Sequence, residues 1–173
     1  MVYIGMYDPN PVVYRTGWKM LRDGGVALRD FDPDLRDLLR QDSATFIEQF
    51  QRGEGDEGEA VFDYLQNAGA FAVTTESAGS FTTKWSRAGG NSIHAYEYPA
   101  LARHARAFDE IDDPGAFDYS MHAVTPRVND IVAFRAGDQF LLVQVLEVHG
   151  GPEYGSDHTA VRIRWQVRPR CSR

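Results

Sequence analysis

The hydrophobic pattern of this chain changes near residue 69, and that change most constrains what the chain can fold into. Before it, apolar residues recur at spacings of three, four and seven, which is one apolar face of a helix. These residues are Leu35, Leu38, Leu39, Phe46, Ile47 and Phe50. After it, apolar and β-branched runs bounded by glycine-containing turns predict strands. We therefore expect two parts: an α/β unit over residues 1–51 and a β-rich barrel or sandwich over residues 70–173.

The charge distribution places the boundary at the same point. Residues 1–69 hold 7 basic and 13 acidic residues, a net charge of −6, whereas residues 70–173 hold 11 and 12, a net charge of −1. The whole chain carries −7, which disfavours nonspecific binding to nucleic acid or to an anionic membrane. No apolar run reaches the ~18 residues of a membrane span, and the N-terminus lacks the basic start of a signal peptide. We expect a cytoplasmic protein that binds neither nucleic acid nor a membrane.

The first part predicts two strands and two helices. A strand over 2–7 leads into the turn DPNP, and a helix over 12–23 is followed by a strand over 26–29. Gly24 and Gly25 should end the helix by supplying a positive φ. Asp32 and Pro33 predict the N-cap and the first position of the second helix.

The segment between the two parts is predicted to be a linker. Residues 52–59, RGEGDEGE, are polar, acidic and rich in glycine, which is typical of a flexible connection. Residues 60–67, AVFDYLQN, indicate a short helix that bridges the parts. The linker and bridging helix together occupy residues 52–69.

The second part predicts six strands and one helix. The strand-like runs are AFAVTT, SFTTKW, SIHAYEY, VNDIVAF, FLLVQVLEV and TAVRIRWQV. The run FLLVQVLEV is nearly all apolar and is expected to be a central strand. Residues 99–108 indicate a helix, and residues 109–127 indicate a long surface connection.

The best candidate for a ligand site is the stretch 81–98. A glycine-rich turn between two strand-like runs offers backbone amides and an arginine, which suit a phosphate or carboxylate, and the aromatic residues suit a base or a sugar. The predicted ligand-binding residues are Lys84, Trp85, Arg87, Asn91, Ser92, His94 and Tyr96. The same turn is also what any hairpin needs, so this interpretation competes with a purely structural one.

The remaining charged clusters favour structural roles. Glu147 and His149 lie two apart at a strand end and indicate a surface ion pair. The basic residues 103–106 and the carboxylates 109–113 indicate a charged helix face with an acidic exit. The five histidines and the single cysteine, Cys171, show no zinc-site spacing. We predict no catalytic residue, no metal and no cofactor for this chain alone.

The first 51 residues resemble the closing half of a cytidine-deaminase-like domain, as found in riboflavin-biosynthesis and nucleotide deaminases. The order strand, DPNP, helix, glycine, strand carries the resemblance. The matching residues are Asp8, Pro9, Asn10, Pro11, Gly17, Leu21, Arg22, Gly25 and Val26. In that family a zinc site built from H-x-E and P-C-x-x-C precedes this segment. Neither motif occurs here, so the resemblance implies a catalytic half on another or truncated polypeptide.

Two classes of function remain open from the sequence. The chain is either a binding or regulatory module for a nucleotide-like ligand or a partner protein, or the C-terminal portion of a zinc-dependent deaminase. A fragment with two strands and apolar helices would leave a strand edge and a helix face to be covered. We therefore expect association, as a homo-oligomer or with a partner chain.

Overall fold

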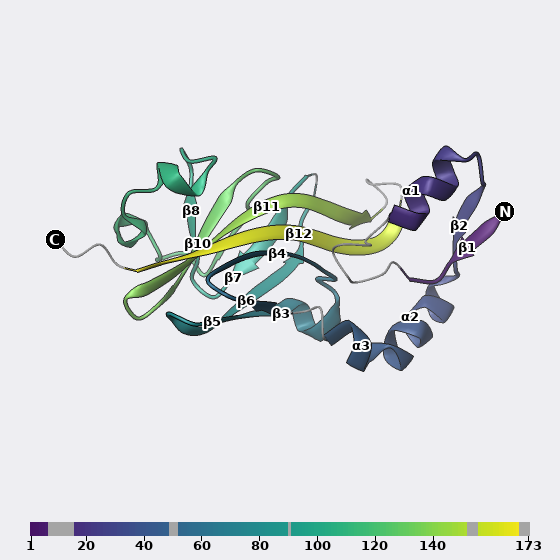
Figure 1. Ribbon diagram of the computed structural model, residues 1–173, viewed down its shortest axis with the longest axis horizontal. Helices are drawn as coiled ribbons and strands as arrows, with labels where there is room; N and C mark the ends of the chain where they lie inside the picture. The colour runs from purple at the N-terminus through teal and green to yellow at the C-terminus, as the bar shows by residue number, and fades with distance from the viewer. Residues whose placement is uncertain (7–15, 49–51, 90, 152–155, 170–173) are drawn as a thin grey trace.

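The computed structural model describes residues 1–6, 16–48, 52–89, 91–151 and 156–169. Most of the chain forms a β-rich body, and a small α/β unit at the N-terminus projects from one end of it (Figure 1). The chain is therefore mostly β, as the sequence predicts. The residues Asp8 and Asn10 of the DPNP turn, and Cys171, lie outside the described residues.

The body consists of two five-stranded sheets. The first has the order β4 (Glu57–Phe62), β12 (Ser156–Pro169), β11 (Gln139–Gly151), β10 (Ile131–Ala136) and β8 (Ala100–Ala102). The second has the order β3 (Arg52–Glu54), β5 (Ala70–Thr75), β6 (Gly79–Arg87), β7 (Ile93–Tyr96) and β9 (Ala123–Val124). The run FLLVQVLEV lies in β11, the middle strand of the first sheet, which confirms its predicted central position.

The core lies between the two sheets and is rich in aromatic side chains. Phe62 of the first sheet stacks on Phe71 of the second at 4.5 Å between ring centroids. Trp85 of β6 packs edge-on against Phe134 of β10 at 5.7 Å. Alternation along β6 places Phe81, Thr83 and Trp85 inward, as expected for a sheet with one buried face. Two such sheets packed face to face form a sandwich.

The predicted linker over 52–59 is wrong, because these residues are strands of the body. β3 pairs in parallel with β5, and β4 pairs antiparallel with β12. The glycines have a packing role: a Cβ on Gly53 or Gly58 would lie 2.5 or 2.4 Å from the ring of Trp165. The absence of a side chain at these two positions lets the Trp165 ring lie against the backbone. In the sequence alone, the same glycines are indistinguishable from those of a flexible linker.

The predicted helices over 60–67 and 99–108 are also wrong. Residues 60–62 complete β4, and a short 3₁₀ turn, η1 (Gln66–Gly69), follows. Residues 100–102 form β8, which pairs with β10 in the register Ala102↔Ile131. In both segments pairing with neighbouring strands overrides a helix-like local composition.

The long connection predicted over 109–127 is confirmed in outline and covers part of the outer face of the first sheet. It contains the 3₁₀ turns η2 (Phe108–Glu110) and η3 (Pro114–Ala116) and ends in β9. Ile111 and, partly, Phe117 and Tyr119 pack on Ile131 and Leu142 in a second, smaller core.

The N-terminal unit has the predicted order of strand, helix, strand and helix. It comprises β1 (Val2–Ile4), α1 (Thr16–Asp23), β2 (Leu28–Asp30), α2 (Pro33–Asp42) and α3 (Ala44–Glu48). β1 and β2 pair in parallel, with Tyr3 opposite Arg29. Gly25 ends α1 with φ +76°, and the Val26 N–H donates to the Leu21 carbonyl at 3.0 Å, as in a Schellman cap.

One predicted helix of this unit is divided. The apolar face from Leu35 to Phe50 was expected to lie on a single helix, but α2 ends at Asp42 and α3 begins at Ala44. The described contacts that hold the unit on the body include a buried side chain and an ion pair. Ile47 is buried, and Arg40 Nε lies 3.4 Å from Asp63 Oδ2, just after β4. None of the described helices is both long and apolar enough to span a membrane.

Candidate functional site

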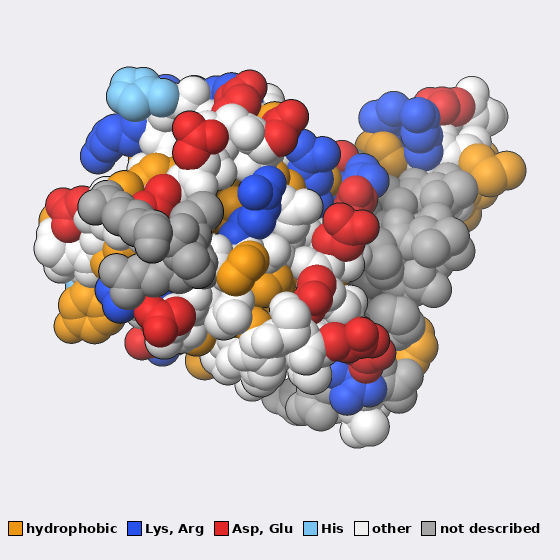
Figure 2. All heavy atoms as spheres, turned by 60° about the vertical axis from the view of Figure 1, so that its left-hand side comes forward, with side chains coloured by type: hydrophobic (Ala, Val, Ile, Leu, Met, Phe, Trp, Pro, Cys, Tyr) orange, Lys and Arg blue, Asp and Glu red, His pale blue; other side chains and the backbone are white. Residues whose placement is uncertain are grey.

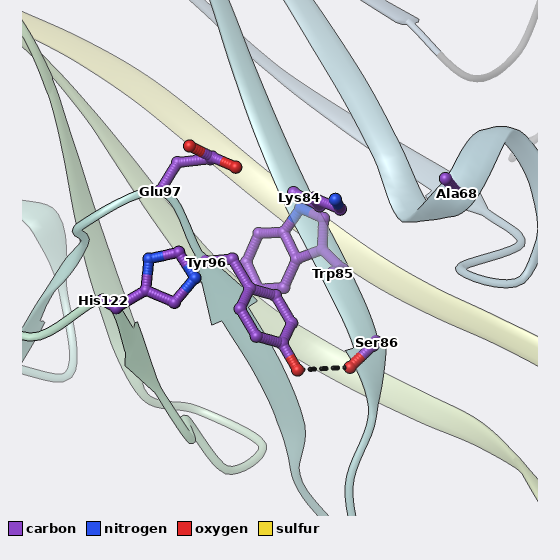
Figure 3. Close-up of a pocket in the computed structure, with 7 residues that line it drawn as sticks. All are labelled: Ala68, Lys84, Trp85, Ser86, Tyr96, Glu97 and His122. Atoms are coloured by element: carbon purple, nitrogen blue, oxygen red, sulfur yellow. Dashed lines mark hydrogen bonds between the residues drawn. The ribbon is translucent and has the colours of Figure 1, made fainter.

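A pocket of about 290 Å³ opens on the second sheet, on the face away from the core (Figure 3). β6 and β7 form its floor, η1 closes one side, and the segments that follow β7 and precede β9 close the other. The lining residues are Ala68, Lys84, Trp85, Ser86, Tyr96, Glu97 and His122.

Tyr96 lies at the centre of this pocket. Its hydroxyl is 2.8 Å from the Ser86 hydroxyl on the neighbouring strand, which holds the half-buried ring in one orientation. Lys84 is directly opposite Tyr96 in the strand register. In Figure 3, Lys84 and Ser86 lie on one side of the tyrosine ring, and Glu97 and His122 lie on the other.

The charged groups of the pocket are available for a ligand. Lys84 and Glu97 are both exposed, and their side chains take part in no hydrogen bond or ion pair within the described part of the chain. The site therefore presents a cation on one side of an aromatic ring and an anion on the other. A free ammonium suits phosphate or carboxylate, and a free carboxylate suits N–H donors.

Further aromatic rings extend the pocket wall. The His122 ring is 5.9 Å from the Tyr96 ring and 5.2 Å from the Tyr98 ring between centroids. His94 lies 6.1 Å from Tyr96, and its Nδ1 is 2.9 Å from the Thr125 hydroxyl. Together these rings make one edge of the second sheet a surface for planar groups.

The backbone on both sides of the pocket adopts the left-handed region without glycine. On one side Asn67 and Ala68 have φ of 46° and 49°, and on the other Glu97 and Tyr98 have φ of 73° and 55°. Such residues cost about 1–3 kcal/mol each and cluster at functional sites. At Glu97 and Tyr98 the chain leaves the second sheet and enters β8 of the first, so the strained turn also sets where the carboxylate of Glu97 stands.

Gly69 fixes the η1 side of the pocket. A Cβ at this position would lie 1.8 Å from the Trp85 carbonyl oxygen, and φ is +76°. The close approach of the two backbones holds Ala68 against β6. A side chain at residue 69 would push this wall away from the floor.

The structure brings three of the predicted ligand-binding residues to the pocket, but it does not support the role we expected for Trp85. The Trp85 indole is only 1% exposed, and its Nε1 donates to the Thr83 hydroxyl at 2.7 Å. Alternation along β6 turns residue 85 into the core and residues 84 and 86 outward. A ligand ring therefore has no access to the indole, whereas Lys84 and Tyr96 do face the pocket.

The other predicted residues do not line the pocket. Arg87 is exposed at the end of β6, three residues or about 10 Å along this strand from Lys84, and Asn91 is exposed in the connection to β7. Ser92 is buried, and its hydroxyl donates to the Gly89 carbonyl. His94 contacts the Tyr96 ring without being one of the lining residues.

Glu97 and His122 were missed as site residues. Glu97 belongs to the run HAYEY, where it follows the outward-facing Tyr96 and only the left-handed turn brings it back to the pocket. His122 comes from the segment assigned to a surface connection, and the pairing of Tyr96 with Ala123 brings it beside the site. No local pattern in the sequence predicts the pairing of β7 with β9.

A second charged cluster lies on the outer face of the first sheet. Glu147 Oε2 is 2.8 Å from His149 Nε2, and Glu147 Oε1 is 3.1 Å from Arg162, which also pairs with Glu59. Burial alone would raise the pKa of the Glu147 carboxyl, but hydrogen bonds from His149 and Arg162 outweigh it and hold that pKa below its ordinary value. The predicted contact between Glu147 and His149 is confirmed, and the additional pairing of Glu147 with Arg162 favours a structural role for this cluster.

Two carboxylates of the acidic segment 109–113 accept hydrogen bonds from nearby backbone N–H groups. Glu110 accepts from the Arg106 N–H at 2.7 Å, and Asp113 accepts from the Gly115 N–H at 2.9 Å. The predicted helix over 99–108, which would precede this acidic segment, is replaced by β8 and turns. Among the described residues, no group of three or more His, Cys, Asp or Glu side chains is placed to hold a metal ion.

No family model matches this chain, and neither a curated protein nor a solved structure resembles it at a significant level.

Proposed function

We propose that this protein is a binding module for a small nucleotide-like ligand, which it holds in the pocket over Tyr96. One observation supports the proposal: an aromatic ring fixed by a hydrogen bond lines the same pocket as an ammonium and a carboxylate that have no partner among the described residues. Structural ion pairs would neutralise each other, as Glu147 and Arg162 do. Lys84 and Glu97 instead stand apart on opposite sides of the ring.

The size of the pocket limits the ligand. A volume of about 290 Å³ is near the lower end of the ~300–1,000 Å³ of small-molecule sites. Such a pocket accommodates one ring system with an attached charged group, and a dinucleotide would extend beyond it. A base stacked on Tyr96, with its phosphate near Lys84 and its N–H donors near Glu97, uses both charged groups of the pocket.

Titration calorimetry with the four ribonucleoside 5′-monophosphates tests this function. Tyr96→Leu should weaken binding by about 1–3 kcal/mol, because it removes the stacking surface. Lys84→Ala should weaken a nucleotide more than the corresponding nucleoside, since it removes the partner of the phosphate.

Arg87→Ala is the matched control, because Arg87 is an exposed cation on the same hairpin but outside the pocket. We expect it to leave affinity unchanged. Loss of binding in Arg87→Ala but not in Lys84→Ala would move the site to the hairpin turn. Absence of binding to every nucleotide would overturn the proposed function.

A second candidate function rests on the N-terminal unit. Eight of the eleven exposed large hydrophobic side chains in the described part of the chain belong to residues 1–48. Its two-stranded parallel sheet is far smaller than the sheets that normally fold alone. Figure 2 shows this unit standing out from the body at the right, with hydrophobic side chains on its outer surface.

We infer that this unit associates with another polypeptide, either a second copy or a separate half-domain. The β1–α1–β2 crossover is the arrangement that the resemblance to deaminase-like domains implies, and a catalytic zinc half on another chain would complete its sheet. Sedimentation of the chain at micromolar concentration tests association. Leu38→Glu places a charge on the most exposed leucine of α2, 55% exposed, and should convert an assembly to monomer. A monomer in the unmodified chain, with no partner half found, would contradict it.

A further inference from the structure

Glu97 stands where it can read the hydrogen-bonding edge of a ring that lies on Tyr96. It directly follows Tyr96 in the chain, lines the pocket, and has no described side-chain partner. Its backbone is left-handed, with φ 73°, a conformation that favours glycine or asparagine. The presence of a glutamate there, at a cost in backbone strain, points to a role for its side chain in the pocket.

An ionised carboxylate only accepts hydrogen bonds, and this property distinguishes the bases from one another. Guanine presents two adjacent donors, N1–H and the 2-amino group, which match the two carboxylate oxygens. Adenine and cytosine place a ring-nitrogen lone pair next to their single amino group, and that lone pair would face a carboxylate oxygen. Uracil places its one N–H between two carbonyl oxygens, which a carboxylate repels.

The opposite side of the ring supports the same ligand. Lys84, across the strand register from Tyr96, is placed to pair with an anionic group carried by the ring. The cation and the anion of the pocket thus divide two tasks: Lys84 binds charge, and Glu97 reads the edge of the base. A ligand that carries N–H donors toward Glu97 but no anionic group toward Lys84 would leave the Lys84 ammonium without a partner.

We propose that Glu97 makes this pocket selective for guanine-type ligands, in which two neighbouring N–H groups donate to its carboxylate. This inference rests on the proposed nucleotide-binding function. Among the ligands of that class it selects guanosine 5′-monophosphate, or another small ring system with the same pair of donors.

The test compares guanosine, inosine and adenosine 5′-monophosphates by titration calorimetry with the full chain and with Glu97→Gln. Inosine monophosphate lacks only the 2-amino group, and adenosine monophosphate lacks both donors. We expect guanosine monophosphate to bind about tenfold or more tightly than either, because a hydrogen bond to a charged group is lost in each case. In Glu97→Gln, one oxygen becomes a donor, and the preference should fall to within about twofold.

The outcomes separate this inference from the function on which it rests. Equal affinity for the three nucleotides, or an unchanged preference in Glu97→Gln, would overturn the guanine assignment while the pocket remains a nucleotide site. Absence of binding to all three would overturn both. Thermal unfolding of the variant serves as the folding control, and Glu97→Asp, which keeps the carboxylate on a shorter side chain, should retain part of the preference.

Discussion

The sandwich body and the N-terminal unit treat their apolar side chains in opposite ways. In the body, Trp85, Phe71 and Ile93 are almost wholly buried between two sheets. In the N-terminal unit, Met20, Leu35 and Leu38 are each at least half exposed, although the sequence gives them the spacing of a helix face. The body therefore buries its apolar side chains in a core of its own, whereas the described part of the unit leaves much of its apolar surface exposed.

The two regions also differ in what their exposed groups offer. The body displays a concave site with a fixed aromatic ring and two charged groups, which suits a small polar ligand. The unit displays exposed apolar side chains, which suit a protein partner. The proposed ligand site and the proposed association surface thus lie in different parts of the chain, and substitutions should affect one without the other.

Truncating a core residue should produce the largest loss of stability. Trp85→Ala removes an indole that packs on Phe134 and bonds to Thr83, and should lower the free energy of unfolding by about 3–5 kcal/mol. Leu38→Ala in the N-terminal unit is the matched case and should change it by less than about 0.5 kcal/mol. Urea denaturation measures both, and equal losses would erase the distinction between the two regions.

A glycine pair inside the body isolates close packing from backbone strain. Gly69 and Gly79 have φ of +76° and +75°, but only Gly69 faces a close neighbour, the Trp85 carbonyl. Gly69→Ala should cost about 3 kcal/mol from overpacking and strain together, and Gly79→Ala about 1 kcal/mol from strain alone. Equal costs in thermal or urea unfolding would show that the backbone contact at the pocket wall is unimportant.

Strain at the candidate site predicts a gain of stability on substitution. Glu97→Gly relieves a left-handed backbone at φ 73° and should raise the free energy of unfolding by up to about 1 kcal/mol. Glu97→Gln keeps the strain and should leave stability unchanged. A gain in stability together with a loss of ligand selectivity would be the trade-off expected of a functional position. A destabilised Glu97→Gly variant would show that the side chain serves the fold.

The smallest expected effect concerns pH. Because hydrogen bonds hold the pKa of Glu147 below its ordinary value of 4.5, this carboxyl stabilises the folded state above about pH 4.5, and the contribution is lost as pH falls through its folded pKa. The side chain is 43% exposed, so solvent screening limits the effect to a few tenths of a kcal/mol. Urea denaturation between pH 3 and pH 6 measures it, with Glu147→Gln as the variant that should lack this dependence. An identical pH profile in both proteins would contradict the assignment.

The sequence predicted the strands inside the body better than it predicted the residue at which the body begins. Strong alternation and apolar runs identify β5, β6, β10, β11 and β12, because each reports directly which face is buried. The strands at 52–62 were missed because Gly53 and Gly58 carry no side chain to show a pattern. A side chain at either position would collide with the ring of Trp165, which lies more than 100 residues away in the chain.

The sequence predicted only those pocket residues that lie on the paired strands of one hairpin. Lys84 and Tyr96 face the pocket because they alternate with core residues on paired strands. Trp85 was misassigned, since its aromatic character is equally consistent with a core position and with a ligand platform. Glu97 and His122 depend on a left-handed turn and on the pairing of β7 with β9, and neither is encoded by a local motif.

Titration of guanosine 5′-monophosphate into the full chain, Tyr96→Leu and Leu38→Glu tests most directly the claim that the body holds the ligand site and the N-terminal unit does not. We predict one binding event per chain, weakened about tenfold or more in Tyr96→Leu and unchanged in Leu38→Glu. Binding that survives Tyr96→Leu but is lost in Leu38→Glu, or no binding to the unmodified chain, would contradict this account.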